Sequence, residues 1–235
     1  AVYVREPGTG SRTVVLLHGY SDHGGTWCKV EPELAERYRV LTVDLPGFGR
    51  SSGQWRTPVI DHYVDTVADL VADSAEPVAV IGNSLGAVTA LAFASAHPKR
   101  TDRVVLSDMP GLAGIPPRAW TQSARLPLDR VSRLLSRPVP VPVMQRAIGE
   151  FYTRAALHRP DRMDAATLTA FTANFADRRQ VDTMLRVGGR TAVRELGRLP
   201  IPPDGARADH ADPAGVGGRA RPGHAGAGIA ARRRR

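Results

Sequence analysis

The first 110 residues alternate between short apolar runs and longer stretches with helical character. The short runs predict strands, most of them buried on both faces, at residues 2–5, 13–17, 39–44, 78–81 and 103–106. The longer stretches predict helices at residues 26–37, 59–75 and 85–96. Strands that alternate with helices indicate a mostly parallel sheet with helices on both faces, so the predicted fold class is α/β.

The pattern changes after Asp108. Residues 110–186 show no strand alternation, and their proline-punctuated helical stretches predict a helical cap that excludes water from a site. The alternative is a further helical layer without substrate contact. Residues 203–235 have no apolar run, which predicts a disordered or irregular, low-complexity tail. The predicted division is an N-terminal core at 1–109, a helical cap at 110–186, a helix returning to the core at 187–202 and a tail at 203–235.

The net charge of +9 does not by itself indicate a nucleic-acid partner. The arginines form no stripe and have no stacking aromatic residues among them, so no nucleic acid is predicted. Binding of a polyanion by Arg232–Arg235 is a minor alternative. The sequence carries no signal for an oligomeric state.

Neither a membrane span nor a secretory signal is visible in the chain. No run approaches about 18 apolar residues, and the N-terminus lacks a long apolar stretch, so we expect a cytoplasmic protein. The single cysteine, Cys28, fits a reducing compartment and is most simply a packing residue. No cluster has zinc-ligand spacing, and neither a metal nor another cofactor is predicted.

The segment Gly82-Asn83-Ser84-Leu85-Gly86 lies between a predicted strand and a predicted helix and fits the pattern G-x-S-x-G. Because the chain must turn within about one residue, this context predicts a strained serine whose hydroxyl is exposed above the sheet. The helix beginning at Leu85 directs N–H groups and the positive end of its dipole toward the group that Ser84 attacks. We therefore predict that Ser84 is a nucleophile; the alternative is an ordinary Gly/Ser turn.

Other polar residues follow the neighbouring strands, namely His18-Gly19-Tyr20, Asp44 and Asp108. The carboxyl ends of parallel strands meet at one edge of a sheet, where ligands bind in such folds. The sequence therefore predicts that these residues and Ser84 share one edge.

In this order, the motifs resemble the α/β-hydrolase superfamily in its serine-nucleophile, cap-containing branch, over about residues 1–200. The resemblance implies Ser84 as the nucleophile and the backbone N–H groups of Tyr20 and Leu85 as the oxyanion hole. It implies structural roles for His18, Asp44 and the Gly47/Gly49 loop. A serine rather than an aspartate at this position implies an acyl-enzyme and a small ester-like or other carbonyl substrate, without a cofactor.

The resemblance also implies a triad acid and a histidine base after the cap, because a serine needs both to be activated. The strand that would carry the acid is missing after Pro202, so the acid and base remain unknown. The residues that could substitute are Asp108, Asp204, Asp209, Asp212, His210 and His224.

One hypothesis for the missing strand is a truncation, or a frameshift near codon 203. Degenerate codons for residues 203–210, read one nucleotide later, permit a strand-like sequence that begins Pro-Thr. Two functions therefore stay open: a serine hydrolase acting through Ser84, or a catalytically inactive hydrolase-fold protein that lacks the triad acid and base.

Overall fold

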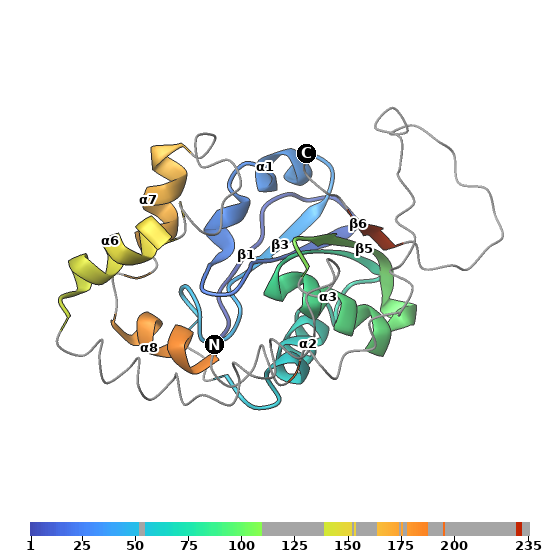
Figure 1. Ribbon diagram of the computed structural model, residues 1–235. Coiled ribbons are helices and arrows are strands. Elements are labelled where there is room, and N and C mark those ends of the chain that lie inside the picture. The colour runs from blue at the N-terminus through green and yellow to red at the C-terminus, as the bar shows by residue number, and fades with distance from the viewer. Residues whose placement is uncertain are drawn as a thin grey trace.

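The computed structural model describes residues 1–51, 55–109, 139–151, 153, 164–173, 175, 178–187, 195 and 229–231. Within them, one sheet has the strand order β1-β3-β2-β4-β5-β6 (Figure 1). The strands are β1 (Val4–Arg5), β2 (Thr13–Leu17), β3 (Arg39–Val43), β4 (Val78–Asn83), β5 (Thr101–Ser107) and β6 (Ile229–Ala231). All pairings are parallel except that of β1 with β3, which confirms the predicted fold class.

Helices cover both faces of the sheet, because alternate residues of its central strands are apolar on each side. On one face, Val15, Leu17 and Val80 pack with α2 (Val59–Leu70) and α3 (Leu85–Ala96) in the larger core. On the other face, Val14, Leu16 and Val40 pack with the 3₁₀ helix η1 (Gly24–Trp27) and α1 (Glu31–Ala35). The short 3₁₀ helix η2 (Pro98–Arg100) leads into β5.

Two predicted helices differ from those observed. The helix expected at residues 26–37 is divided into η1 and α1, because Pro32 has no N–H to continue a helix across this point. The helix expected at residues 59–75 ends at Leu70, and Arg100 donates to the Val71 carbonyl at 2.6 Å, a group that a longer helix would have bonded itself.

Three helices stand to the left of the sheet in Figure 1: α6 (Val141–Phe151), α7 (Ala165–Ala173) and α8 (Arg178–Val187). They share a small core of Met144, Phe171, Phe175 and Val181. All three lie within the predicted cap, except for Val187 at the end of α8, which packs in the larger core. Residues 110–138 of the predicted cap lie outside the described residues, as does most of the predicted return helix.

The tail contains a strand that the sequence does not predict. Ile229–Ala231 forms β6 and pairs in parallel with residues 104–106 of β5. A strand of three residues can pair with β5 because parallel pairing uses only backbone N–H and C=O groups. It therefore requires no long apolar run in the sequence. The frameshift stays a hypothesis at these residues, because such a pairing requires no particular side chains. Asp204, Asp209, Asp212, His210 and His224 lie outside the described residues.

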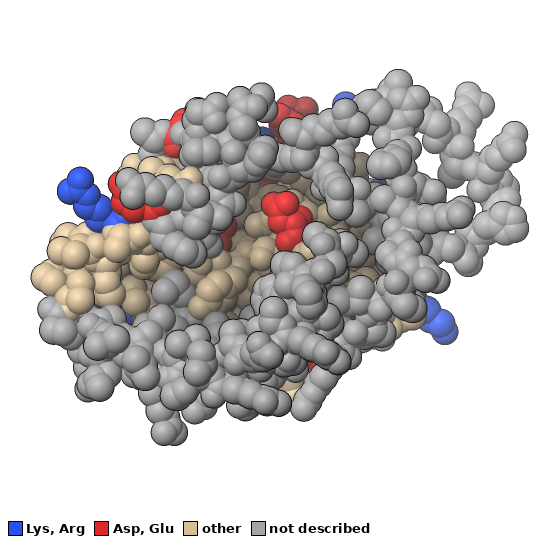
Figure 2. Space-filling view, viewed as in Figure 1, with Lys and Arg blue, Asp and Glu red and all other residues tan. Residues whose placement is uncertain are grey.

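Charge is dispersed on the visible surface. On the face in Figure 2, the acidic and basic side chains of the described residues are scattered rather than gathered into one stripe. In the described part of the chain, we find no helix with the length and apolar character needed to cross a bilayer.

Candidate functional site at the carboxyl edge of the sheet

The register of the sheet brings the predicted site residues to one edge. Val43 of β3 pairs with Leu17 of β2, and Leu17 pairs with Gly82 of β4. Gly82 in turn pairs with Leu106 of β5. Asp44, His18, Ser84 and Asp108 follow these paired positions within two residues, so they lie along the same edge.

Ser84 occupies the turn between β4 and α3 in a conformation that few non-glycine residues adopt. Its φ is 51° and its ψ is −112°, which places it outside the favoured regions. Its N–H donates to the Ser107 carbonyl at 2.9 Å, while its carbonyl accepts from the N–H groups of Ala87 and Val88. The backbone on both sides is therefore fixed, and the strain at Ser84 is maintained by the surrounding structure.

The two glycines beside Ser84 are required by close packing. A Cβ on Gly82 would lie 2.2 Å from the Gly86 carbonyl oxygen. A Cβ on Gly86 would lie 2.2 Å from the Leu17 carbonyl oxygen and 2.6 Å from that of His18. Helix α3 can thus begin directly against the end of β2 only because both positions lack a side chain.

The loop after β2 lies against Ser84. A Cβ on Gly19 would be 3.4 Å from Ser84 Cβ and 3.1 Å from Asn83 Nδ2. Tyr20 follows Gly19 directly, and Leu85 is the first residue of α3, so their backbone N–H groups come from the two segments that flank the serine. This arrangement suits stabilisation of the negative charge that would develop on a carbonyl oxygen if Ser84 attacked the carbonyl carbon.

His18 is fully buried and joins the ends of β2 and β3. Its Nε2 accepts from the Leu45 N–H at 2.9 Å, which leaves the proton on Nδ1 to be donated to the Gly19 carbonyl at 2.7 Å. Burial lowers the pKa of His18, although Asp22 opposes this shift. The ring is neutral with both nitrogens occupied, as expected of the structural role that the resemblance implies.

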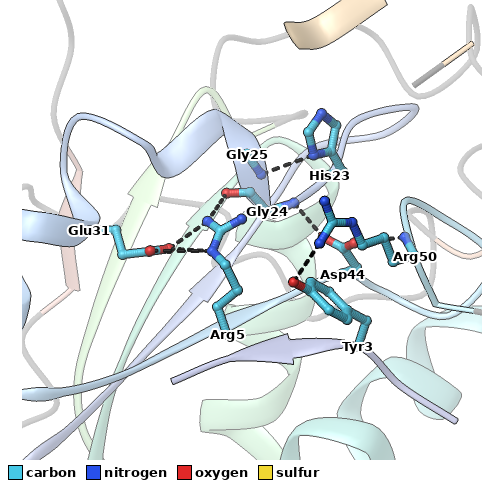
Figure 3. A network of polar contacts seen from close by, with 8 residues as sticks. All are labelled: Tyr3, Arg5, His23, Gly24, Gly25, Glu31, Asp44 and Arg50. Carbon is cyan, nitrogen blue, oxygen red and sulfur yellow. Dashed lines mark hydrogen bonds and ion pairs between the residues drawn. The ribbon is translucent and has the colours of Figure 1, made fainter. Parts of the chain in front are cut away.

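Asp44 joins two loops through its buried carboxylate (Figure 3). Oδ1 accepts from the Gly24 N–H at 2.6 Å, and Oδ2 accepts from the Arg50 N–H at 2.8 Å. Arg5 donates to the Gly24 carbonyl at 3.0 Å and forms an ion pair with Glu31 at 2.5 Å. Gly24, at the beginning of η1, is therefore held from both sides.

Asp22 is a buried carboxyl group in the loop that carries Tyr20. Its Oδ1 accepts from the His23 N–H at 2.8 Å. Burial raises the pKa of Asp22, while His18 and this hydrogen bond act in the opposite direction. Ser21 beside it is buried and has a φ of 60°. The loop between His18 and Gly24 is thus tightly constrained.

The triad acid and base are not identified in the described residues. Among the described residues, no histidine forms a hydrogen bond with the Ser84 hydroxyl. His18 is occupied as above, the His23 ring accepts from the Gly25 N–H, His62 contacts Arg56, and His97 packs on Phe93. Of the acids considered, Asp108 is the one that the structure describes. It has a φ of 48° and directly follows Ser107, whose carbonyl accepts from Ser84.

No group of three or more His, Cys, Asp or Glu side chains suited to a metal ion occurs among the described residues. Cys28, exposed at the end of η1, is a free thiol rather than the partly buried packing residue that the sequence suggests.

Comparison with known proteins identifies the family. The sequence model of the alpha/beta hydrolase family matches residues 14–230, which is most of the chain. The chain belongs to the alpha/beta hydrolase family. The resemblance inferred from the three motifs is thereby confirmed.

Two curated relatives are named as a hydrolase and an esterase. A 2-hydroxy-6-oxononadienedioate/2-hydroxy-6-oxononatrienedioate hydrolase from Cupriavidus pinatubonensis is 33% identical over 174 residues, which are 70% of this chain and 57% of that protein. A pimeloyl-acyl-carrier-protein methyl ester esterase from Edwardsiella ictaluri is 33% identical over 105 residues, which are 45% of this chain and 39% of that protein. The chain spans little more than half of the first relative and well under half of the second.

A solved structure agrees with the family fold. MenH from S. aureus superimposes with a TM-score of 0.66 at 16% identity, over 85% of this chain and 72% of that chain. At this identity the likeness supports the alpha/beta hydrolase fold alone.

The sequence pattern does not single out three residues that hold the loops beside Ser84, namely Arg5, Asp22 and Gln180. Asp22 could have been noticed as an acid five residues after a buried strand. Arg5 and Gln180 left no signal, because each bonds a backbone carbonyl distant in the sequence. Such partners are set by the fold and leave no residue pattern.

Proposed function

We propose that this chain is a serine hydrolase in which Ser84 attacks the carbonyl carbon of a small ester-like or other carbonyl substrate and forms an acyl-enzyme. The observation that carries the proposal is the strained backbone of Ser84, with φ 51° and ψ −112°, between β4 and α3. In a turn of this kind the serine Oγ is exposed at the top of the sheet, where a substrate can reach it.

The Tyr20 and Leu85 backbone N–H groups are the proposed oxyanion hole. The first N–H groups of a helix have no partner within the helix, and the helix dipole adds positive charge at Leu85. The closeness of Gly19 to Ser84 supports a position for the Tyr20 N–H on the other side of the same oxygen. Each such donor is worth roughly 3–4 kcal/mol in the transition state.

The proposed substrate class is supported by the names of the relatives, one a methyl ester esterase and the other a hydrolase of an oxo-dienedioate. Both names are compatible with nucleophilic attack at a carbonyl group. We further propose that the cap, residues 110–186, covers the site and excludes water, which strengthens the electrostatic interactions within it. The contacts of α8 with the loop after β3 support this position.

The second candidate function is a hydrolase-fold protein without catalytic activity. The observation that favours it is the absence of a histidine hydrogen-bonded to Ser84 among the described residues, because a serine without a base is a poor nucleophile.

Covalent labelling and turnover test these two candidates together. Wild-type protein should react with a fluorophosphonate probe and hydrolyse a short p-nitrophenyl ester, and Ser84→Ala should lose both activities. Ser95→Ala is the matched control, since Ser95 is an exposed serine of the same helix and bonds only the Leu91 carbonyl. Labelling that persists in Ser84→Ala would contradict the proposal, and a folded wild type with neither activity would favour the inactive protein.

A further inference from the structure

The loop after β3, residues 44–51, lies between cap helix α8 and the loop after β2, residues 18–24. We refer to these segments as the β3 loop and the β2 loop. On the cap side, Gln180 Nε2 donates to the Gly49 carbonyl at 2.8 Å. Thr183, one turn further along α8, approaches so closely that a Cβ on Gly47 would lie 3.0 Å from its Cγ2. Helix α8 therefore contacts the β3 loop at two points.

The opposite side of the β3 loop holds the β2 loop. The Asp44 carboxylate bonds the N–H groups of Arg50 and Gly24, one from each loop. The Phe48 ring meets the rings of His18 and Tyr20 edge-on, with centroids 5.8 Å and 6.1 Å away. The β3 loop thus contacts the β2 loop beside Tyr20 and at Gly24.

The β3 loop has little freedom to absorb a displacement. Gly47 has a φ of 92° and Gly49 a φ of 54°, and a Cβ on Gly49 would lie 2.2 Å from Asp44 Oδ2. Asp44 and Phe48 are buried. A movement at Gly49 must therefore reach Arg50 and the Asp44 carboxylate, because packed segments shift together rather than deform continuously.

The orientation of the Gln180 amide is set by this contact. Its Nε2 faces the Gly49 carbonyl, while its Oε1 is buried and has no hydrogen-bond partner among the described residues. A buried acceptor without a partner costs free energy. A reversed amide would place Gln180 Oε1 against the Gly49 carbonyl oxygen, and two acceptors cannot bond each other. The side chain is thus held in one orientation by its bond to the β3 loop.

We propose that Gln180 is a positioning residue that couples the docking of cap helix α8 to the conformation of the β2 loop through Gly49 and Asp44. Its consequence for the Tyr20 N–H, and so for catalysis, rests on the proposed function. The coupling itself can be measured without activity.

Hydrogen exchange on the full-length chain tests the coupling. Gln180→Met keeps the length of the side chain but removes the donor, and we expect about fivefold faster exchange over residues 18–25, the effect of losing one hydrogen bond on local opening. Gln145→Met is the matched control, because Gln145 Nε2 donates to the Thr172 carbonyl at 3.1 Å and joins α6 to α7 instead. Unchanged exchange over residues 18–25 in folded Gln180→Met, or an equal increase in both variants, overturns the proposal.

A second measurement on the wild type keeps the proposal falsifiable if Gln180→Met does not fold. With rising urea below the unfolding transition, residues 18–25 and 178–187 should become exchange-competent in one step. Separate steps overturn the coupling.

Kinetics then distinguish positioning from a purely structural role. Gln180→Met should lower kcat for a p-nitrophenyl ester with little change in KM, since the oxyanion donor acts in the transition state. A change confined to KM, or none at a temperature where the variant is folded, contradicts the catalytic consequence. Absence of turnover in the wild type would contradict the proposed function and leave the exchange test of the coupling intact.

Discussion

At the scale of single residues, Asp22 is a carboxyl group held in an unfavourable environment close to the proposed site. Burial raises its pKa above the ordinary value of 3.8. The folded protein therefore keeps the Asp22 proton at pH values where the unfolded chain has lost it. The contribution of Asp22 to stability is fully present below about pH 3.8 and is lost as the pH rises through the higher folded pKa.

The replacement Asp22→Asn removes the contribution of Asp22 to the pH dependence of stability. An amide keeps Oδ1 as an acceptor for the His23 N–H and has no proton to lose. We expect the free energy of unfolding of the wild type, relative to Asp22→Asn, to fall as the pH is raised from 3.5 to 7 (roughly the range in which buried carboxyls titrate). Urea unfolding at several pH values measures it. Asp69→Asn, at an exposed position on α2, is the matched control, and a flat difference for Asp22→Asn would contradict the prediction.

At the scale of elements, helix α2 receives its N-terminal cap from a distant segment. Pro58 precedes the helix and supplies no side-chain cap. Glu195 instead accepts from the Val59 and Ile60 N–H groups, both at 2.9 Å. A carboxylate at this end also interacts favourably with the helix dipole. Glu195, which follows α8 in the chain, therefore stabilises a helix of the core.

Removing this carboxylate should destabilise the protein. We expect Glu195→Ala to lower the free energy of unfolding by about 1–2 kcal/mol, because two N–H groups lose an ionised acceptor. Glu195→Gln should lose less, since it retains one acceptor oxygen. Glu36→Ala, an exposed glutamate after α1, should stay within about 0.5 kcal/mol of the wild type. Equal effects of Glu195→Ala and Glu36→Ala in urea unfolding would show that the Glu195 carboxylate contributes nothing to the stability of α2.

At the scale of the whole molecule, the helices of the proposed cap contact the core at a second place as well as through Gln180. Lys29, just after η1, pairs with Asp164 at 2.5 Å, and Asp164 also accepts from the Thr167 N–H at 2.7 Å at the beginning of α7. Both side chains are exposed, so this pair adds little to global stability and is screened by salt. Its effect should be local to the contact between α7 and the core.

Salt dependence tests this second contact. Lys29→Met and Asp164→Asn should each speed proteolysis or hydrogen exchange at residues 164–173 at low ionic strength, and the difference from the wild type should disappear near about 1 M salt. Lys99→Met provides the control, because Lys99 is an exposed lysine of η2 that forms no ion pair with another described residue. A difference that persists unchanged at high salt would contradict an electrostatic origin.

The accuracy of sequence-based prediction followed the range of the interactions involved. The strand at residues 13–17 and the helix at residues 85–96 were predicted with their observed bounds, because local apolar patterns and the flanking glycines determine them. The helix at 26–37 was wrong because the effect of Pro32 outweighed the periodicity. Strand β6 and the capping of α2 by Glu195 were missed, since each depends on a backbone partner that is distant in the sequence.

The roles of Ser84, Tyr20 and Leu85 stay predictions, although the strained serine and the close approach of Gly19 agree with them.

The sequence by itself determined the alternation of strands and helices, the α/β class and the position of Ser84 between β4 and α3, because these follow from periodicity and from two glycines in a five-residue motif. Only the tertiary structure decided how the β2 loop is held, and which residue of the proposed cap bonds the β3 loop beside it. Those features consist of bonds from Asp44 and Gln180 to backbone groups of other segments. Any residue offers the same backbone groups, so the folded arrangement alone selects the partners.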